Sequence, residues 1–428
     1  MAPQDVEAVA SAAVSQWGSD LARPASVADA IGGRGPHVVL APTDAATLGT
    51  MLRWANAERL AVAVRGGGTK LTWGDMPSRA DVVLSTERLI EPVDHTAGDL
   101  VATVPAGATL DAVNDVLRRQ HQWLPLDPPM SRAATMGGVI ATNDSGPRRH
   151  RHGAPRDLIL GVEIVLTDGR TVKAGGRVVK NVAGYDLSKL LCGSLGCLAV
   201  ITKATFKLAP VAPVSRTLVA TVGDVRRLGT LALSVAGAPL GPSTIEIQSP
   251  PHRLLVRFET APRAADEQTA AAHRLCTGQG ATTEILSGQA EGDEWHAHER
   301  RAWNAPATMV KLAILPTDVA EMLARVERLA MDGGVDHHVV GRAALGVVFA
   351  RLDGDPDRQA AIVEDLRRDA VGRGGSAVLL SAPPQLMAQL GSWGPMTDAA
   401  SIMRAVKARF DPHNTLNPGR GAWESRPS

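Results

Sequence analysis

The sequence has few cysteines. Its 428 residues include only three cysteines, Cys192, Cys197 and Cys276, and no two of them have the Cys-x-x-Cys spacing. An odd count without this spacing argues against a disulfide framework, a zinc site or an iron–sulfur cluster held by this chain. We therefore expect a protein of a reducing compartment.

Long apolar runs and a large net charge are also missing. No apolar run approaches ~20 residues, so no membrane-spanning helix is expected. The net charge of +1 predicts no broad attraction to nucleic acid or to a membrane surface. The first residues are acidic where a signal peptide would be basic, so none is expected. The length allows two or three globular domains.

The stretch from 61 to 70 is the most informative one. An apolar run over 61–64 predicts a short buried strand, and Arg65, three glycines, Thr69 and Lys70 follow it. Glycine lets the backbone approach a ligand, and consecutive N–H groups form an anion-binding concavity. With the two cations and the hydroxyl, the loop predicts a phosphate or pyrophosphate site. A glycine-rich turn without a ligand is the alternative.

The spacing excludes two familiar phosphate loops. A Gly-x-Gly-x-x-Gly fingerprint would need glycine at position 71, which is Leu71. The Gly-x4-Gly-Lys-Ser/Thr pattern of a P-loop is also absent.

Further small residues occur between 124 and 147. Three prolines, Pro125, Pro128 and Pro129, disfavour regular structure before Ser131. The segments 135–138 and 145–146 then offer additional N–H groups to a ligand, unless their glycines serve only packing. The basic run 148–152 follows, either as a solvated loop or as a contact to a ligand or partner.

Secondary-structure patterns divide the chain. The predicted strand 37–42, helix 44–58 and strand 61–64 form a β-α-β unit, with the glycine loop where α/β sheets bind ligands. From residue 215 the order is β-α-β-β-α, twice, which predicts an antiparallel sheet backed by helices. Thr397 is the expected N-cap of a last helix.

Four motifs, in this order, resemble the FAD-binding domain of the vanillyl-alcohol-oxidase, or PCMH-type, flavoproteins. They are R-G-G-G-T-K, A-T-M-G-G, R-D-L-I-L-G-V-E-I-V-L-T-D-G and G-S-L-G-C-L-A-V-I-T. The resemblance implies an α+β fold, with a PCMH-type FAD-binding domain of two α/β subdomains and an antiparallel-sheet α+β cap domain. The expected divisions are an N-terminal helix and linker (1–35), the FAD-binding domain (36–210), the cap domain (211–395), and a C-terminal helix and tail returning to the FAD domain (396–428).

The resemblance also implies the cofactor and its contacts. In this family the first loop binds the FAD pyrophosphate, the Thr-x-Gly-Gly and Ser-Gly segments line the cofactor, and the Val-Ile-Thr backbone meets the adenine. The implied contacts here are Arg65, Gly66, Gly67, Gly68, Thr69, Lys70, Pro128, Thr135, Gly137, Gly138, Ser145, Gly146, Val200 and Ile201. Because the loop 65–70 contains no His or Cys for a covalent link, we expect non-covalent FAD.

Within the family, the chain more closely resembles the FAD-binding E subunits of bacterial glycolate oxidases. The segments 145–149, 180–186 and 410–420 carry this resemblance. It implies oxidation of glycolate, a small 2-hydroxy acid, in a complex with a larger flavoprotein subunit and an iron–sulfur subunit. The expected location is the cytoplasm, or the inner face of the membrane peripherally through that complex. Cys197 departs from the threonine that is common at its position.

The catalytic residues are not identified by the resemblance. Four side chains, Arg148, Lys180, Tyr185 and Arg420, are candidates for the flavin neighbourhood. The cap lacks the His-x-Gly-Asp-Gly-Asn-type segment with which catalytic relatives build a metal and substrate site, and its histidine pairs lack carboxylates at matched spacing. No metal site is therefore expected. A stand-alone FAD-dependent oxidoreductase of another alcohol or hydroxy acid, and a non-catalytic FAD-bearing assembly subunit, remain as alternatives.

Overall fold

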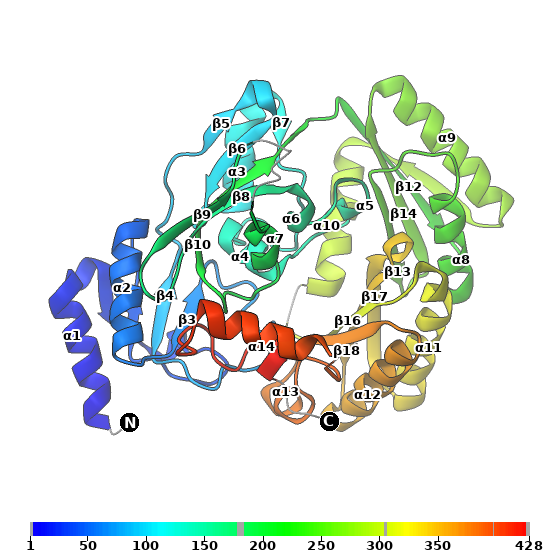
Figure 1. Ribbon diagram of the computed structural model, residues 1–428. Helices are drawn as coiled ribbons and strands as arrows, with labels where there is room; N and C mark the ends of the chain where they lie inside the picture. The colour runs from blue at the N-terminus through cyan, green and yellow to red at the C-terminus, as the bar shows by residue number, and fades with distance from the viewer. Residues whose placement is uncertain (1–2, 178–183, 304–305, 397, 425–428) are drawn as a thin grey trace. The chain divides into compact units, whose positions relative to one another are not determined.

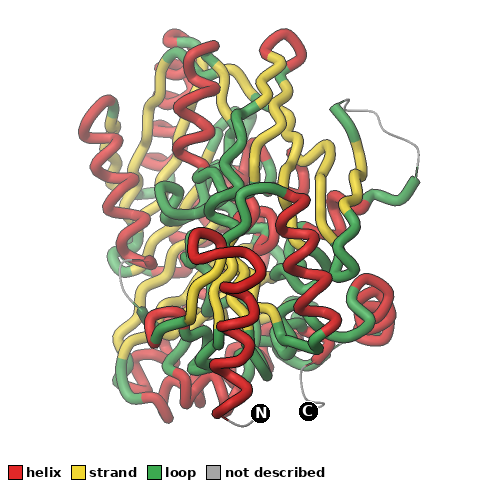
Figure 2. The backbone as a smooth tube through the Cα atoms, turned by 90° about the vertical axis from the view of Figure 1, so that its left-hand side faces the viewer, coloured by secondary structure: helices red, strands yellow, loops and turns green. Residues whose placement is uncertain are grey.

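The computed structural model describes residues 3–177, 184–303, 306–396 and 398–424. The chain divides into two compact units, drawn in Figure 1. Unit 1 comprises 1–145, 154–211 and 395–428, and unit 2 comprises 146–153 and 212–394. Figure 2 shows helices in red and strands in yellow along both units. Among the described residues, no helix has both the length and the apolarity needed to cross a membrane.

Unit 1 begins with a small sheet whose strand order is β1-β2-β4-β3. The last three strands are parallel, and β1 pairs antiparallel with β2 at one edge. Helix α2 packs Leu48, Met51 and Leu52 into the core of this sheet, and Asp44 caps it by accepting a hydrogen bond from the Thr47 N–H. The elements are α1 (Pro3–Leu21), β1 (Ala22–Pro24), β2 (Val38–Leu40), α2 (Ala45–Ala57), β3 (Val62–Arg65) and β4 (Val82–Ser85).

A second, antiparallel sheet of unit 1 has the order β5-β6-β10-β8-β9. Its core includes side chains of α3, α4 and α7. The elements are β5 (Asp94–Thr96), β6 (Val101–Pro105), α3 (Leu110–Leu117), α4 (Met136–Thr142), α6 (Pro155–Leu158), β8 (Ile159–Val165), β9 (Thr171–Gly175), α7 (Leu187–Leu191) and β10 (Val200–Lys207), with β7 (Gln122–Trp123) and β11 (Ala209–Pro210) paired separately.

Helix α4 was not predicted from the sequence. Thr135 is its N-cap, and Gly137 and Gly138 lie in its first turn. Glycine disfavours a helix interior, but Met136 and Ile140 are fully buried on the same side of the helix. Tertiary packing therefore decides the conformation here.

The end of the chain completes the first sheet. The Val62 N–H donates to the Thr415 carbonyl at 2.7 Å, and the Asn417 N–H donates to the Val62 carbonyl at 2.8 Å. Residues 415–417 thus run beside β3, the strand that feeds the glycine loop. They follow α14 (Ala399–Phe410), whose predicted N-cap, Thr397, lies outside the described residues.

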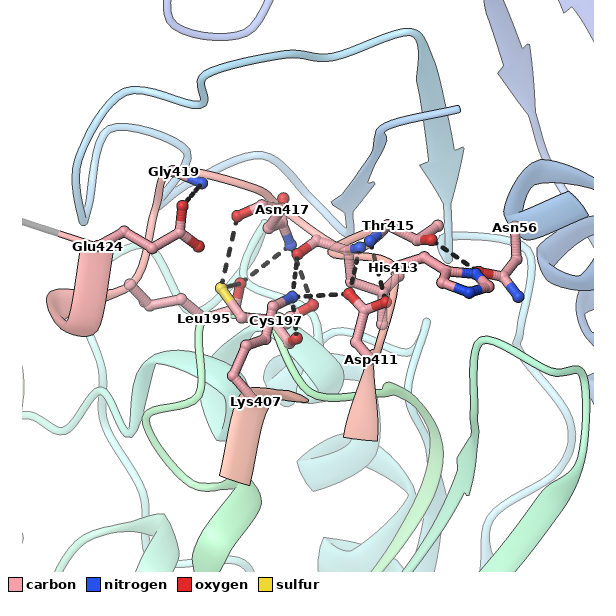
Figure 3. Close-up of polar contacts among 12 residues, drawn as sticks. Asn56, Leu195, Cys197, Lys407, Asp411, His413, Thr415, Asn417, Gly419 and Glu424 are labelled. Carbon is pink, nitrogen blue, oxygen red and sulfur yellow. Dashed lines mark hydrogen bonds and ion pairs between the residues drawn. The ribbon is translucent and has the colours of Figure 1, made fainter. Parts of the chain in front are cut away.

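A buried ion pair holds this terminal segment in place. Lys407 donates to the Asp411 carboxylate at 2.7 Å and to the carbonyls of Cys197 and Leu416 at 2.8 and 2.9 Å, as Figure 3 shows. Asp411 also accepts the N–H groups of Thr415 and Leu416. Both side chains are almost fully buried. Because each charge has several hydrogen-bond partners, the pair escapes the usual penalty of a lone buried charge.

Unit 2 is built on an eight-stranded antiparallel sheet of order β15-β12-β14-β13-β17-β18-β16-β19. Helices α8, α9, α11 and α12 pack along one face, whereas α10 packs on the other (Figure 1). The elements are α5 (Arg149–His152), β12 (Val214–Thr221), α8 (Val225–Ala236), β13 (Thr244–Ser249), β14 (Arg253–Thr260), α9 (Pro262–Gly278), β15 (Thr282–Leu286), α10 (Gly288–Trp303), β16 (Thr308–Ala313), α11 (Val319–Gly333), β17 (Asp336–Arg342), β18 (Val347–Asp353), α12 (Pro356–Gly372), β19 (Ser376–Ser381) and α13 (Pro384–Leu390).

The Lys407 network generates a stability prediction. Lys407→Met should destabilise unit 1 by about 3 kcal/mol, because it leaves Asp411 as a buried charge without its cation and two carbonyls without a donor. The matched control is Arg409→Met on the same helix, where the side chain is exposed. Urea unfolding followed by circular dichroism checks this, and equal midpoints for the two variants would contradict it.

Candidate functional site

One pocket of unit 1 gathers most of the predicted cofactor residues. Gly66, Gly67, Gly68, Thr69, Lys70, Thr135, Gly137, Gly138, Val200 and Ile201 line it. Its enclosed volume is about 80 Å³, below the roughly 300–1,000 Å³ of a typical ligand pocket. The cavity therefore has room for one part of a dinucleotide, such as its phosphates, with the remainder extending outside it.

The glycine loop lies against the segment that precedes α4. A Cβ atom on Gly66 would overlap the Thr135 hydroxyl, and one on Gly67 would overlap the Ala133 carbonyl oxygen. Gly68 has φ +74°, in the left-handed region that other residues rarely adopt. Side chains are therefore excluded from this side of the loop, and its backbone forms a wall of the pocket.

The start of α4 contributes a second polar wall. The N–H groups of Met136 and Gly137 donate to the carbonyls of Ala108 and Ala106, which fixes the helix beside the end of β6. Gly138, the next residue, is half-buried and lines the pocket. A helix start carries partial positive charge, so this wall favours an anion.

The two cations of the loop are not free, contrary to the expectation that they bracket a phosphate. The Arg65 guanidinium pairs with Asp29 at 3.2 Å. Hydrogen bonds from Arg23 hold the pKa of Asp29 far below its usual range. Burial alone would raise this pKa, and the hydrogen bond from Arg65 lowers it further. Lys70 donates to the Pro129 carbonyl at 3.0 Å and lies 3.2 Å from an Asp144 carboxylate oxygen. Anion binding in this pocket would thus depend on backbone N–H groups.

Arg420 is the catalytic candidate that the fold brings to the pocket. It is buried, and burial lowers its pKa. Its guanidinium donates to the carbonyls of Leu71 and Trp73, the residues directly after the glycine loop. Arg420 therefore fixes the path of the chain that leaves the loop.

The other catalytic candidates do not line this pocket. Arg148 belongs to unit 2, where its guanidinium forms a bidentate pair with Glu259 at 2.7–3.2 Å. Burial would raise the pKa of Glu259, but the hydrogen bonds and charge of Arg148 lower it to about 2. Tyr185 is 93% exposed, and Lys180 lies outside the described residues.

Four predicted cofactor residues also lie outside the pocket lining. The Arg65 side chain points to Asp29, and Pro128 and Ser145 are buried in unit 1. Gly146 belongs to unit 2, where its carbonyl accepts a hydrogen bond from Arg342 at 3.1 Å.

Several residues that line the pocket were not identified from the sequence. They are Val64, Leu71, Thr86, Ala141, Thr142, Leu195, Gly196 and Ala199. Leu195, Gly196 and Ala199 lie within a recognised motif, and the others except Thr86 lie close to one. Thr86 follows β4, and because β4 runs parallel to β3, the carboxyl ends of both strands meet at one sheet edge. Sheet topology was the signal that could have found it.

No group of three or more metal-ligating side chains is assembled in the part of the chain that the structure describes. The three cysteines are buried, and desolvation raises the pKa of each thiol, to about 12 for Cys192 and about 11 for the other two. These thiols are therefore protonated at neutral pH and poor ligands.

Two family models match the chain. One, described as an FAD binding domain, matches residues 36–175, and the other, described as the C-terminal domain of FAD linked oxidases, matches residues 393–420. These matches include the glycine loop, α4 and Arg420. They support FAD as the cofactor.

Curated relatives extend the similarity. Glycolate oxidase subunit GlcD of Bacillus subtilis is 26% identical over 422 residues, which cover 90% of this chain and 88% of that protein. D-lactate dehydrogenase of Archaeoglobus fulgidus is 29% identical over 419 residues, covering 90% of each chain. Glycolate oxidase subunit GlcE of Escherichia coli is 36% identical over only 157 residues, which cover 36% of this chain and 44% of that one.

The fold is shared with a solved structure. A structure of p-cresol methylhydroxylase with substrate bound matches with a TM-score of 0.77 at 14% identity, covering 98% of this chain and 97% of that one. The predicted α+β fold, with a PCMH-type FAD-binding domain, is confirmed. The chain is therefore an FAD-linked oxidoreductase whose residues 36–175 match an FAD binding domain.

Proposed function

We propose that this chain binds FAD non-covalently and serves the oxidation of a small 2-hydroxy acid, with glycolate as the first candidate. The observation that carries this proposal is the unit 1 pocket, where two recognised motifs bring backbone N–H groups and a helix start together. Two of the relatives similar over nearly the whole chain are named for glycolate and D-lactate, both small 2-hydroxy acids, and a third is named for D-2-hydroxyglutarate.

Different pocket residues would contact different parts of FAD. The loop 66–69 and Gly138 would hold the pyrophosphate, and Val200 and Ile201 would contact the adenine. Arg420 would hold the chain that leaves the loop in position through its hydrogen bonds to the Leu71 and Trp73 carbonyls. When bound, FAD supplies the acceptor for the hydride that leaves the alcohol carbon of the substrate.

We further propose that the chain acts as one subunit of a glycolate-oxidase-type complex, with a larger flavoprotein subunit and an iron–sulfur subunit as partners. The stronger local similarity to subunit GlcE supports this assignment. So do the missing His-x-Gly-Asp-Gly-Asn-type segment and the buried thiols. The complex would lie in the cytoplasm or peripherally at the inner membrane face.

A second function is favoured by one observation. Similarity to a D-lactate dehydrogenase extends over 90% of the chain, which suits a stand-alone dehydrogenase of another 2-hydroxy acid. Turnover by the isolated chain separates the two possibilities.

The pocket assignment predicts the effect of Gly138→Asp. A Cβ here meets only the Thr135 hydroxyl at 3.4 Å, and a carboxylate in the first turn stabilises a helix. The variant should fold normally yet bind FAD at least about a hundredfold more weakly, since like charges ~4 Å apart repel by about 4 kcal/mol at an effective dielectric constant of ~20. Gly138→Ala is the control and should keep its flavin. Fluorescence titration with FAD measures both affinities, and equal affinities would refute the assignment.

Non-covalent binding predicts a simple result on denaturation. When the FAD-loaded chain is precipitated with acid, all flavin absorbance should move to the supernatant, because the loop 65–70 offers no His or Cys for attachment. Flavin that stays in the washed pellet would show a covalent link.

The subunit assignment predicts that the isolated chain, loaded with FAD, reduces a dye with glycolate far more slowly than the same chain co-expressed with the two proposed partners. D-lactate is assayed in parallel. Rapid turnover of either acid by the isolated chain would make it an enzyme in its own right, whereas equally slow turnover with partners present would support a purely structural role.

A further inference from the structure

The two faces of the unit 2 sheet differ in chemistry. Side chains alternate between the faces along a strand. On β13, Ile245 and Ile247 are buried on one face, whereas Glu246 and Gln248 are buried on the other, which α10 covers. An interior sheet face is normally apolar. The face beneath α10 therefore differs from a purely apolar one, because it carries buried polar side chains that need partners beside apolar ones such as Leu255.

Under the first turns of α10 this requirement is met by protein groups. Glu291 accepts hydrogen bonds from Thr217 at 2.8 Å and from Arg257 at 3.0 Å. Further along the helix, the two ring nitrogens of His298 lie 3.1 Å from Glu246 and 3.2 Å from Gln248. Each carboxylate of this part of the face has a cation beside it, since Glu291 pairs with Arg257 and Glu246 lies 3.3 Å from the Arg342 Nε. The Glu246 Oε1 and Gln248 Nε2 atoms are nevertheless buried without a hydrogen-bond partner in the described part of the chain.

At the carboxyl end of α10, positive side chains outnumber negative ones. A cavity of about 420 Å³ opens there, and all of its lining belongs to unit 2. The lining residues are Ala297, Arg300 and Arg301 of α10, His338 of β17, and Arg351 and Asp353 of β18. Three guanidinium groups thus face one carboxylate.

The ion pairs leave two of the three cations uncompensated. Arg351 and Asp353 form a bidentate pair at 2.7 and 3.3 Å. Arg300 and Arg301 have no such partner among the described residues. In addition, the Arg301 Nε and the His338 Nδ1 atoms are buried without a hydrogen-bond partner in the described part of the chain.

We propose that this cavity binds a small dianion, either a dicarboxylate or a phosphate group, and we call it the α10 anion site. A guanidinium presents paired N–H donors that match carboxylate and phosphate oxygens. A dianion would neutralise Arg300 and Arg301 and would give the buried Arg301 Nε an acceptor, removing the cost of leaving that group unpaired.

The site lies at the carboxyl end of a helix, where the helix dipole opposes anion binding. Arginine in a last turn is favourable by itself, and the negative end of the helix dipole disfavours an anion nearby. However, this dipole effect is smaller than that of a charge-assisted hydrogen bond. It also gives no reason for a buried His338 Nδ1 without a partner. The charge-assisted hydrogen bonds from the arginines to a bound dianion should therefore outweigh its repulsion by the helix dipole.

The test is equilibrium binding of malonate and of inorganic phosphate to the FAD-loaded chain, at constant ionic strength, by calorimetry. Acetate is the singly charged comparison. At least one dianion should bind at millimolar concentration or below, more tightly than acetate, and the tighter of the two identifies the class of ligand. Failure of both to bind more tightly than acetate would overturn the proposal.

Variants locate the binding. Arg301→Gln should lower the affinity for the dianion by about tenfold or more, because it removes a charge-assisted contact. Arg328→Gln on α11, an exposed arginine of the same unit outside the cavity, should leave it unchanged. Circular dichroism of both variants verifies folding, and flavin content verifies that the unit 1 pocket is intact. Equal weakening by both, or by neither, would contradict the α10 anion site.

Discussion

The pocket of unit 1 depends on the close approach of two backbone segments. Residues 66 and 67 lie so near to 133 and 135 that a Cβ atom on either glycine would overlap an oxygen atom. The same approach places the glycine loop beside the start of α4. Because the two loop cations pair with aspartates, we expect the backbone rather than side-chain charge to bind phosphate in this pocket.

The rest of unit 1 supports that approach. The first sheet positions β3 and its loop, the second sheet positions α4, and the terminal segment 415–417 bonds to β3 from its free edge. The Lys407–Asp411 pair fixes the terminal segment to the Cys197 carbonyl, and Cys197 lies in the motif that leads into β10. Residues more than 200 positions apart in the sequence thus meet around one pocket.

Local patterns were sufficient to predict much of this arrangement. The apolar run before Gly66 indicates β3, and the alternation from residue 215 indicates the antiparallel sheet. Helix α4 was missed because glycine propensity opposes it and only tertiary packing reveals it. The pairing of Lys70 with Asp144 and of Arg148 with Glu259 was not predictable, since the partners are 74 and 111 residues apart. The polar face beneath α10 was also hidden, because its charges become adjacent only in the folded sheet.

The central claim is that backbone N–H groups of the glycine loop and of α4 bind the pyrophosphate of FAD. A crystal structure of the FAD-loaded chain tests it most directly. The account predicts pyrophosphate oxygens within hydrogen-bonding distance of the N–H groups of residues 66–69 and of Gly138, with Lys70 still paired to Asp144. Phosphates held away from this loop, or bound chiefly by the side chains of Arg65 and Lys70, would contradict it.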